Sequence, residues 1–158
     1  MTAPTVPTLE KVMTMEATID PPQQVGADLS IFNVPDGTIT GDGFSAKIIA
    51  PSADWARPVS DNVLGLDVRL SAQTEAEHYL YFTYFGRVVI TENVAGKMAG
   101  GEEVHGSEMY FTTNPIVKTN DPALAWMNDT IFVGKMQRTT SASTTSQGHL
   151  VYDVYKVV

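Results

Sequence analysis

Apolar and polar residues alternate with a period of two along much of this chain, and this pattern restricts the fold more than any other feature. In residues 9–19, Met13, Met15 and Ala17 fall on one face, and polar residues occupy most of the other. In residues 63–72, four aliphatic side chains share one face in the same way. A period of two is the side-chain period of a β-strand. No segment shows the pattern of a helix longer than a turn or two, so the sequence predicts an all-β protein.

Turn-forming residues separate the alternating segments. Gly, Pro or Ser/Thr residues bound the other predicted strands, which are residues 29–35, 44–49, 79–85, 87–92, 108–113, 116–118, 130–137 and 149–157. We therefore predict a single closed antiparallel β-barrel of roughly nine or ten strands, because closure removes exposed strand edges. Residues 1–8 are predicted to be a mobile tail, and residues 9–158 the barrel domain. The segments 52–55 and 95–106 are predicted to be loops, and the second of them a mobile one.

A single short helix is predicted near residues 122–128. Asp121 is a good N-cap, and Pro122 suits the first helical position. The apolar turn that follows is too short to stand alone, so it should rest on the rim of a barrel. It carries Trp126, and Asn128 follows two residues later, just before a strand. We expect Trp126 to form a pocket wall and Asn128 to line the same pocket.

Charge and composition exclude several classes of function. The net charge is −8, which disfavours nucleic acid and anionic membrane surfaces as partners. The chain has no cysteine, so it has neither disulfides nor thiolate chemistry. Its three histidines show no metal-ligand spacing, and no phosphate-binding glycine motif is present. We expect no cofactor, no metal and a cytoplasmic protein, since no signal peptide or membrane span is apparent.

Asp67 and Arg69 form the first candidate for chemistry. They are two residues apart on one predicted strand, so both side chains leave on the same face, opposite the aliphatic residues. If the aliphatic residues fill the core, the pair is a surface salt bridge worth about 0–1 kcal/mol. If the aliphatic face packs outward, the pair points into the lumen and could move a proton or polarise a carbonyl. We predict the lumenal orientation, with Asp67 as proton carrier and Arg69 orienting a carboxylate or stabilising an oxyanion.

Asp54 is the second candidate, because Trp55 follows it directly. An indole beside a carboxylate can desolvate it, which raises its pKa and suits it to acid–base work. The alternative is a loop aspartate in a local turn, with Trp55 plugging the end of the barrel. Aromatic residues are numerous, and Tyr84 and Tyr110 are candidates to line a cavity, since buried tyrosines need partners for their hydroxyl groups.

Several motifs resemble the DUF3237 family, also called UPF0311, a group of small β-barrel proteins. The resemblance covers about residues 9–158, and its most specific part is the block that runs from Asp121-Pro122 to Gly134. Matching segments are Gly37–Gly41, Ala53-Asp54-Trp55, Leu66–Arg69, Tyr110–Pro115 and Val154–Val157. Thr112 and Asp129 stand where the family has arginine. The resemblance implies a barrel whose pocket is more neutral than is usual in the family, suited to an uncharged ligand.

By analogy with other small barrels, the resemblance favours a cofactor-free isomerase or cyclase. Its substrate would be a hydrophobic, natural-product-like molecule of secondary metabolism, held in an aromatic-lined lumen. Asp54 or Asp67 would move the proton, and Trp55, Tyr110 and Trp126 would shape the pocket. The first alternative is a non-catalytic, lipocalin-like binding barrel. A second alternative is an interaction protein that uses residues 95–106 as its contact, and a homodimer is left open.

Overall fold

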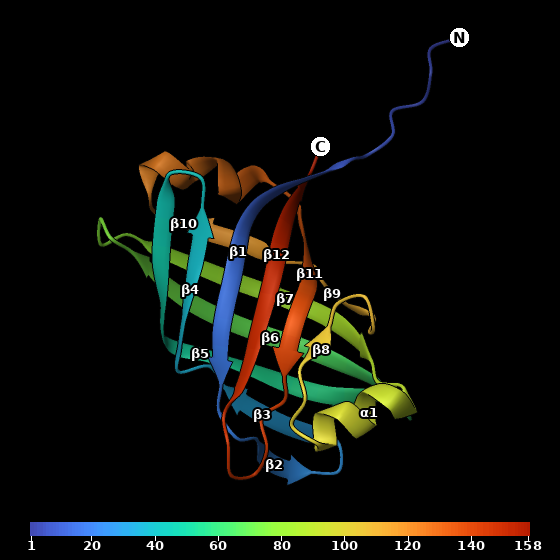
Figure 1. Ribbon diagram of the computed structural model, residues 1–158. Coiled ribbons are helices and arrows are strands. Elements are labelled where there is room, and N and C mark those ends of the chain that lie inside the picture. Colours follow the sequence, from blue (N-terminus) through green and yellow to red (C-terminus); the bar gives the residue numbers. More distant parts are fainter.

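The prediction of an all-β fold with a single closed antiparallel barrel is confirmed. The computed structural model describes all 158 residues, and Figure 1 shows the barrel with two short helices. Eight strands close the barrel, each antiparallel to its neighbours. Around the ring they are β5 (Phe44–Ser60), β6 (Val63–Thr74), β7 (Tyr79–Val89), β9 (Phe111–Thr113), β11 (Phe132–Thr140), β12 (Gly148–Val157), β1 (Leu9–Ile19) and β4 (Asp36–Gly41).

Four further strands extend this ring. They are β2 (Gln23–Gly26) and β3 (Leu29–Asn33), which form a hairpin on β5, β8 (Val104–His105) on β11, and β10 (Ile116–Thr119) on β7. The tight turn between β4 and β5 is Asp42-Gly43, with Gly43 at a φ of 75°, a conformation that an Asp-Gly hairpin turn requires. Residues 1–8 form no helix or strand and extend away from the barrel (Figure 1).

The hydrophobic core occupies the barrel lumen. The alternation in β6 turns Leu66, Val68 and Leu70 inward, where each is no more than 6% exposed. Met13 and Met15 of β1 do the same from the opposite wall and are 1% exposed. In β1 and β6 the apolar face therefore points into the lumen, and the more polar face points to solvent.

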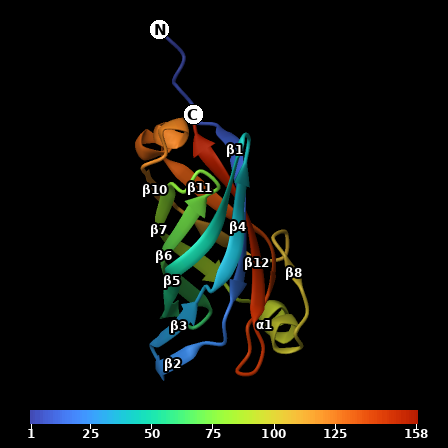
Figure 2. The same cartoon turned by 90° about the vertical axis from the view of Figure 1, so that its left-hand side faces the viewer.

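The two helices lie at opposite ends of the barrel. The 3₁₀ helix η1 (Pro122–Asp129) lies across one end, and the helix α1 (Glu92–Ala99) lies beside the other, which is also the end where β2 and β3 are found (Figures 1 and 2). The predicted helix over 122–128 thus matches η1 closely. Asp121 is its N-cap, as expected, and its carboxylate accepts a hydrogen bond from the Ala123 amide at 2.9 Å.

Two predicted loops are wrong. Residues 52–55 belong to β5, which continues through Pro51 and bends there at a change of register with β6. Residues 95–106 contain most of α1 and all of β8. Thr91 caps α1, and the capping hydroxyl accepts a hydrogen bond from the Val94 amide at 3.3 Å. Capping and the burial of Val94 against the core outweigh the low helix propensity of Gly96.

Candidate functional site

A cavity of about 300 Å³ occupies the half of the lumen that faces α1. Seven of the eight barrel strands, the added strand β3 and the helix α1 contribute side chains, so the barrel wall forms most of its lining. Sixteen of the twenty lining residues are hydrophobic. The lining consists of Ala17, Ile19, Phe32, Val34, Asp54, Leu64, Leu66, Val68, Leu70, Tyr84, Val88, Ile90, Met98, Phe111, Thr139, Thr140, Ser141, Ala142, Leu150 and Tyr152.

Asp54 is the only ionisable carboxyl group in this lining. Its neighbour in the ladder is Val68 of β6, and Val68 is in turn paired with Tyr84 of β7. Asp54, Val68 and Tyr84 therefore stand side by side on three adjacent strands and share the inner face. Strands are about 4.8 Å apart, which places the Cα atoms of Asp54 and Tyr84 about 10 Å from each other.

A backbone hydrogen bond holds the Asp54 carboxyl group. Its Oδ1 accepts from the amide of Asp67 at 3.0 Å, between the Asp54–Val68 and Arg57–Gly65 pairs of the β5–β6 ladder. Burial in the apolar lumen raises the pKa of Asp54 from 3.8 to about 7. The hydrogen bond from Asp67 opposes this rise, and the negative charge of Asp67 adds to it. Asp54 is therefore present in both protonation states near neutral pH, as a general acid or base requires.

Two buried tyrosines line the same cavity as Asp54. Tyr84 and Tyr152 are 4% and 3% exposed, and their rings meet edge to face with centroids 6.2 Å apart. Phe111 packs against Tyr152 at 5.5 Å, also edge to face, and fixes the orientation of that ring. Edge-to-face contacts of this kind are the favoured geometry for aromatic pairs.

Both tyrosines stay protonated at physiological pH. Burial raises the pKa of Tyr84 above its ordinary value, and the charge of Asp54 raises it further, while the hydroxyl of Tyr152 lowers it somewhat. Burial likewise raises the pKa of Tyr152, with smaller contributions from Tyr84 and Asp54. Besides the hydroxyl groups of Thr139, Thr140 and Ser141, the cavity thus presents one titratable carboxyl group and two neutral phenol hydroxyl groups within a mostly apolar wall.

The predicted lumenal orientation of Asp67 and Arg69 is wrong. The two side chains contact each other, with Nη1 of Arg69 3.2 Å from Oδ1 of Asp67, but they lie on the outer face of β6 and are 36% and 50% exposed. The aliphatic residues of β6 fill the lumen, which leaves the outer face to the ion pair. Trp55 lies on this outer face too, with the guanidinium of Arg69 5.6 Å from the centre of its ring. Trp55 therefore does not desolvate Asp54, whose burial comes from the cavity wall.

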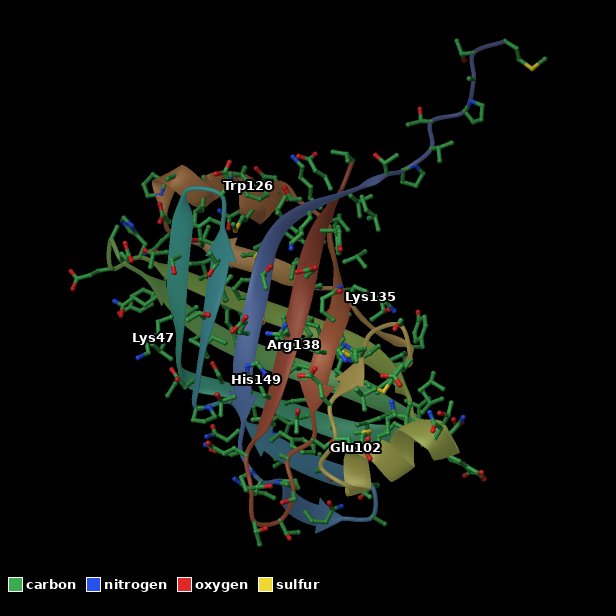
Figure 3. All side chains as sticks on the ribbon, in the orientation of Figure 1. Lys47, Glu102, Trp126, Lys135, Arg138 and His149 are labelled. Atoms are coloured by element: carbon green, nitrogen blue, oxygen red, sulfur yellow. The ribbon has the colours of Figure 1, made fainter.

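Trp126 lies at the opposite end of the barrel from the cavity mouth, where Figure 3 labels it on η1. It lines a separate open cleft of about 950 Å³ between η1, β1 and the β4–β5 turn. Its ring centre is 6.0 Å from that of Phe132, and the ammonium of Lys156 lies 5.9 Å from it. Trp126 thus lines this cleft and not the cavity that contains Asp54, and its role as the wall of a ligand pocket stays a prediction.

Asn128 and Tyr110 also lie outside the cavity. The Asn128 side chain accepts a hydrogen bond from the Thr119 amide at 2.9 Å and donates to the carbonyl groups of Thr119 and Ala125 at 3.2 Å each. It fastens η1 to β10. Tyr110 is 57% exposed, and the ammonium of Lys135 lies 5.0 Å from its ring centre. Of the predicted site residues, only Asp54 and Tyr84 meet in the lumen.

Tyr152 and Phe111 line the cavity, but the sequence did not lead us to predict either of them as a site residue. A signal for Tyr152 was present, because the alternation in β12 puts it on the same face as Leu150 and Val154. Phe111 lies in a strand of only three residues, which is too short to show a period. None of the His, Asp and Glu side chains gather in groups of three that could hold a metal ion. Neither helix is long and apolar enough to cross a membrane.

The chain matches one protein-family model along almost its whole length. The family model described as "Protein of unknown function (DUF3237)" matches residues 7–157. The chain belongs to the DUF3237 family. A UPF0311 protein of Rhodopseudomonas palustris is 25% identical over 128 residues, which cover 81% of this chain and 79% of its own. The crystal structure of a conserved protein of unknown function from the same organism matches with a TM-score of 0.81 and 25% identity, covering 98% of this chain and 100% of its own.

Two more distant structures share the barrel fold. One is a beta-barrel like protein from Acinetobacter baumannii, with a TM-score of 0.73, 20% identity and full coverage of both chains. The other is an enzyme from Penicillium herquei, with a TM-score of 0.65 and 14% identity, covering 100% of this chain and 99% of its own. At these identities the likeness establishes the fold of the DUF3237 chain and leaves its activity to be argued from the site.

Proposed function

We propose that this DUF3237 protein is a cofactor-free isomerase or cyclase that moves a proton within a mostly apolar small molecule. The observation that carries the proposal is Asp54, a carboxyl group with a pKa of about 7 inside a cavity of about 300 Å³. A pKa near the operating pH gives a general acid–base catalyst its greatest efficiency. Titratable groups with strongly perturbed pKa values, placed in a cavity, mark candidate active sites.

Asp54 and the two tyrosines divide the work of a proton shift between them. The Asp54 carboxylate takes a proton from a carbon beside a carbonyl group, and the electron pair of the C–H bond moves toward the carbonyl oxygen. The hydroxyl groups of Tyr84 and Tyr152 donate hydrogen bonds to that oxygen as it gains negative charge. Asp54, now neutral, returns the proton to a second carbon of the conjugated system, so the reaction is an isomerisation with no net change of protons. In a cyclisation, neutral Asp54 first protonates the group under attack. The attacking hydroxyl oxygen then forms the new bond, and the Asp54 carboxylate that results takes up the hydroxyl proton, so Asp54 ends neutral again.

The apolar lining would serve the reaction by excluding water. A dry cavity strengthens the hydrogen bonds from Tyr84 and Tyr152, and it holds a reactive conformer in place. The volume is at the small end of the range for ligand pockets, which points to a compact cyclic ketone, enol or phenol. The lack of any cation in the lining agrees with an uncharged, natural-product-like substrate.

A non-catalytic binding barrel is the second candidate. The predominance of hydrophobic residues in the lining favours it, because an apolar ligand would fill such a cavity without any chemical step. The similarity to the Penicillium herquei protein, which is described as an enzyme, supports the catalytic candidate only weakly, since 14% identity extends to the fold alone. Substitution of Asp54 separates the two candidates.

The experiment uses two small probes that fit the cavity. The isomerisation of 3-cyclohexen-1-one to its conjugated isomer is followed by ultraviolet absorbance, and the binding of phenol is measured by calorimetry. We expect Asp54→Asn to lower turnover by about 10²–10⁴-fold, the usual contribution of a general acid–base group. Phenol affinity should change by less than about threefold, because Asn keeps the shape of the side chain and the acceptor for the Asp67 amide.

Asp67→Asn is the matched control, because it changes the neighbouring carboxylate on the outer face of the wall. It should leave turnover within about threefold of the wild type, as expected for an exposed ion pair. If wild type and Asp54→Asn bind phenol equally and show the same slow turnover, the protein is a binding barrel and the catalytic proposal is wrong.

A further inference from the structure

The lumen cavity is lined by one buried hydroxyl group whose hydrogen bonding within the chain is incomplete. Of Thr139, Thr140 and Ser141, which all line the cavity, only Thr139 is buried, at 9% exposed. Its Oγ1 donates a hydrogen bond to the carbonyl oxygen of His149 at 3.0 Å. A hydroxyl group has one proton and two lone pairs, so Thr139 has no proton left to donate but can still accept.

Two other buried hydroxyl groups of the chain both donate and accept. Oγ of Ser52 donates to a backbone carbonyl at 2.7 Å and accepts from the amide of Ser71 at 2.9 Å. Oγ1 of Thr74 donates to the carbonyl of His78 at 3.3 Å and accepts from its amide at 3.1 Å. Neither residue lines the lumen cavity, whereas Thr139 lines it and receives no hydrogen bond from the chain. The acceptor capacity of Thr139 is therefore left to what occupies the cavity.

The strand register places Thr139 nearer the end of the barrel than Tyr152. Tyr152 is paired with Met136, and Thr139 with Leu150, so the two residues are two positions apart along β12 and one strand apart. At about 3.3 Å per residue and about 4.8 Å between strands, their Cα atoms are about 8 Å apart. β11 ends one residue after Thr139, and its loop to β12 lies at the end of the barrel where β2 and β3 are found (Figure 1). The cavity therefore has an inner polar end at the tyrosine pair and an outer one at Thr139.

The two polar ends of the cavity favour different partners. The hydroxyl groups of Tyr84 and Tyr152 are the donors that the proposed mechanism directs at a carbonyl oxygen. Thr139, whose proton is engaged by His149, favours a group that donates. Most of the remaining lining is hydrophobic. A ligand that satisfies the whole cavity therefore carries an acceptor at one end, a compact apolar body, and a hydroxyl group at the other end.

We propose that the substrate of the lumen site is a cyclic ketone with a second, remote hydroxyl group, and that this hydroxyl donates a hydrogen bond to Oγ1 of Thr139. The inference rests on the proposed function, which assigns the reacting carbonyl to the tyrosines. Thr139 takes no part in the proton shift. It selects for the hydroxylated substrate, because a ligand without the hydroxyl leaves a buried acceptor unpaired. It also determines which end of the substrate enters first.

Calorimetry with three naphthol probes tests the proposal on the full chain. 2-Naphthol, which mimics an enol, offers a single hydroxyl group for the inner end. 2,6-Dihydroxynaphthalene is symmetric and carries a hydroxyl group at each end of the same rigid body. In 6-methoxy-2-naphthol the remote oxygen can accept a hydrogen bond but cannot donate one. The wild type should bind the diol about three- to tenfold more tightly than 2-naphthol, as one additional hydrogen bond allows. It should bind the methoxy probe no more tightly than 2-naphthol.

Substitution of Thr139 identifies the acceptor. Thr139→Val keeps the shape of the side chain and removes its oxygen, so the advantage of the diol over 2-naphthol should fall below about twofold. Thr139→Ser keeps the hydroxyl group and should keep the advantage. Thr113→Val is the matched control, because Thr113 is a buried threonine of the barrel outside the cavity lining, and it should keep the advantage too. The methoxy probe needs no variant, so it tests the proposal even where Thr139→Val, which leaves the His149 carbonyl without its donor, does not fold.

Several results would overturn the assignment of Thr139. They are equal affinity of the wild type for 2-naphthol and the diol, an advantage that survives in Thr139→Val, and an advantage that is also lost in Thr113→Val. A methoxy probe that binds as tightly as the diol would show that size, and not hydrogen-bond donation, is recognised. None of these measurements involves turnover, so a negative result leaves the catalytic role of Asp54 standing. Conversely, an unchanged turnover in Asp54→Asn would leave the affinity ratio of the naphthols as it is.

Discussion

Replacing Asp54 by Asn should make the protein more stable, by an amount that increases with pH. In the folded protein, burial raises the pKa of Asp54 from 3.8 to about 7. Below pH 3.8 the group is protonated in both the folded and the unfolded chain. Between pH 3.8 and 7 the folded chain holds a proton that the unfolded chain has released, so the wild type loses stability as pH rises. Above pH 7 the loss is complete and stays constant.

The magnitude follows from the two pKa values. Each pH unit between them corresponds to about 1.36 kcal/mol, so the full loss is about 4 kcal/mol. The sequence pI is about 4.7, and solubility should be poor near it. Measurements from about pH 5.5 to about pH 8 avoid that range and still cover about 2 kcal/mol of the change. Asn has no titratable group, and its carbonyl oxygen can accept the hydrogen bond from the Asp67 amide.

Urea unfolding of wild type and Asp54→Asn at closely spaced pH values measures the effect. The difference in free energy of unfolding should grow by about 2 kcal/mol in favour of the variant between about pH 5.5 and 7, then level off. Titrations of the other carboxyl groups are common to both proteins and cancel. As a control, Asp67→Asn should change stability by less than about 1 kcal/mol at every pH, as expected for an exposed ion pair. A difference for Asp54→Asn that does not vary with pH would refute the reasoning.

Three further substitutions test the assignment of individual residues. Tyr84→Phe should lower turnover of the cyclohexenone by about 10²-fold with little change in stability, because it removes one hydrogen-bond donor to the developing oxyanion. An unchanged turnover number would show that Tyr84 does not have that role. Trp126→Ala should lower the free energy of unfolding by about 1–3 kcal/mol through lost packing on Phe132, and it should leave phenol affinity unchanged. A large loss of phenol affinity would place the ligand in the cleft that Trp126 lines. Asn128→Ala should lower the free energy of unfolding in urea by about 1–2 kcal/mol, since three hydrogen bonds to Thr119 and Ala125 are lost. An unchanged free energy of unfolding would show that η1 is held by its apolar contacts alone.

The alternation of residues predicted the strands well but not which face was the inside. In β6 the sequence separates Leu66, Val68 and Leu70 from Asp67 and Arg69, and both orientations were consistent with that separation. Closure of the barrel decides the matter, because eight strands enclose a lumen that side chains largely fill, and aliphatic residues fill it best. The orientation of Asp67 and Arg69 was therefore predicted wrongly because it depends on barrel closure, and the alternation within one strand carries no information about closure.

Local signals explain the remaining differences. The caps of α1 were present in the sequence, with Thr91 before the first turn and Lys97 in the last, but two glycines obscured them. Pro51 suggested the end of a strand, although β5 continues through it at a change of register. Asp54 was selected for the wrong reason, since Trp55 lies on the other face of β5. The desolvation that raises the pKa of Asp54 comes from residues distant in the chain, which a sequence reading could not bring together.

The dependence of catalysis on pH tests most directly the claim that Asp54 moves the proton. The kcat/KM of the wild type for 3-cyclohexen-1-one should rise with pH and level off above an apparent pKa of about 7, because the carboxylate is the base that starts the reaction. In Asp54→Asn the residual activity should show no such rise. A wild-type profile that is flat between about pH 5.5 and 8, or a rise that persists in Asp54→Asn, would contradict the account.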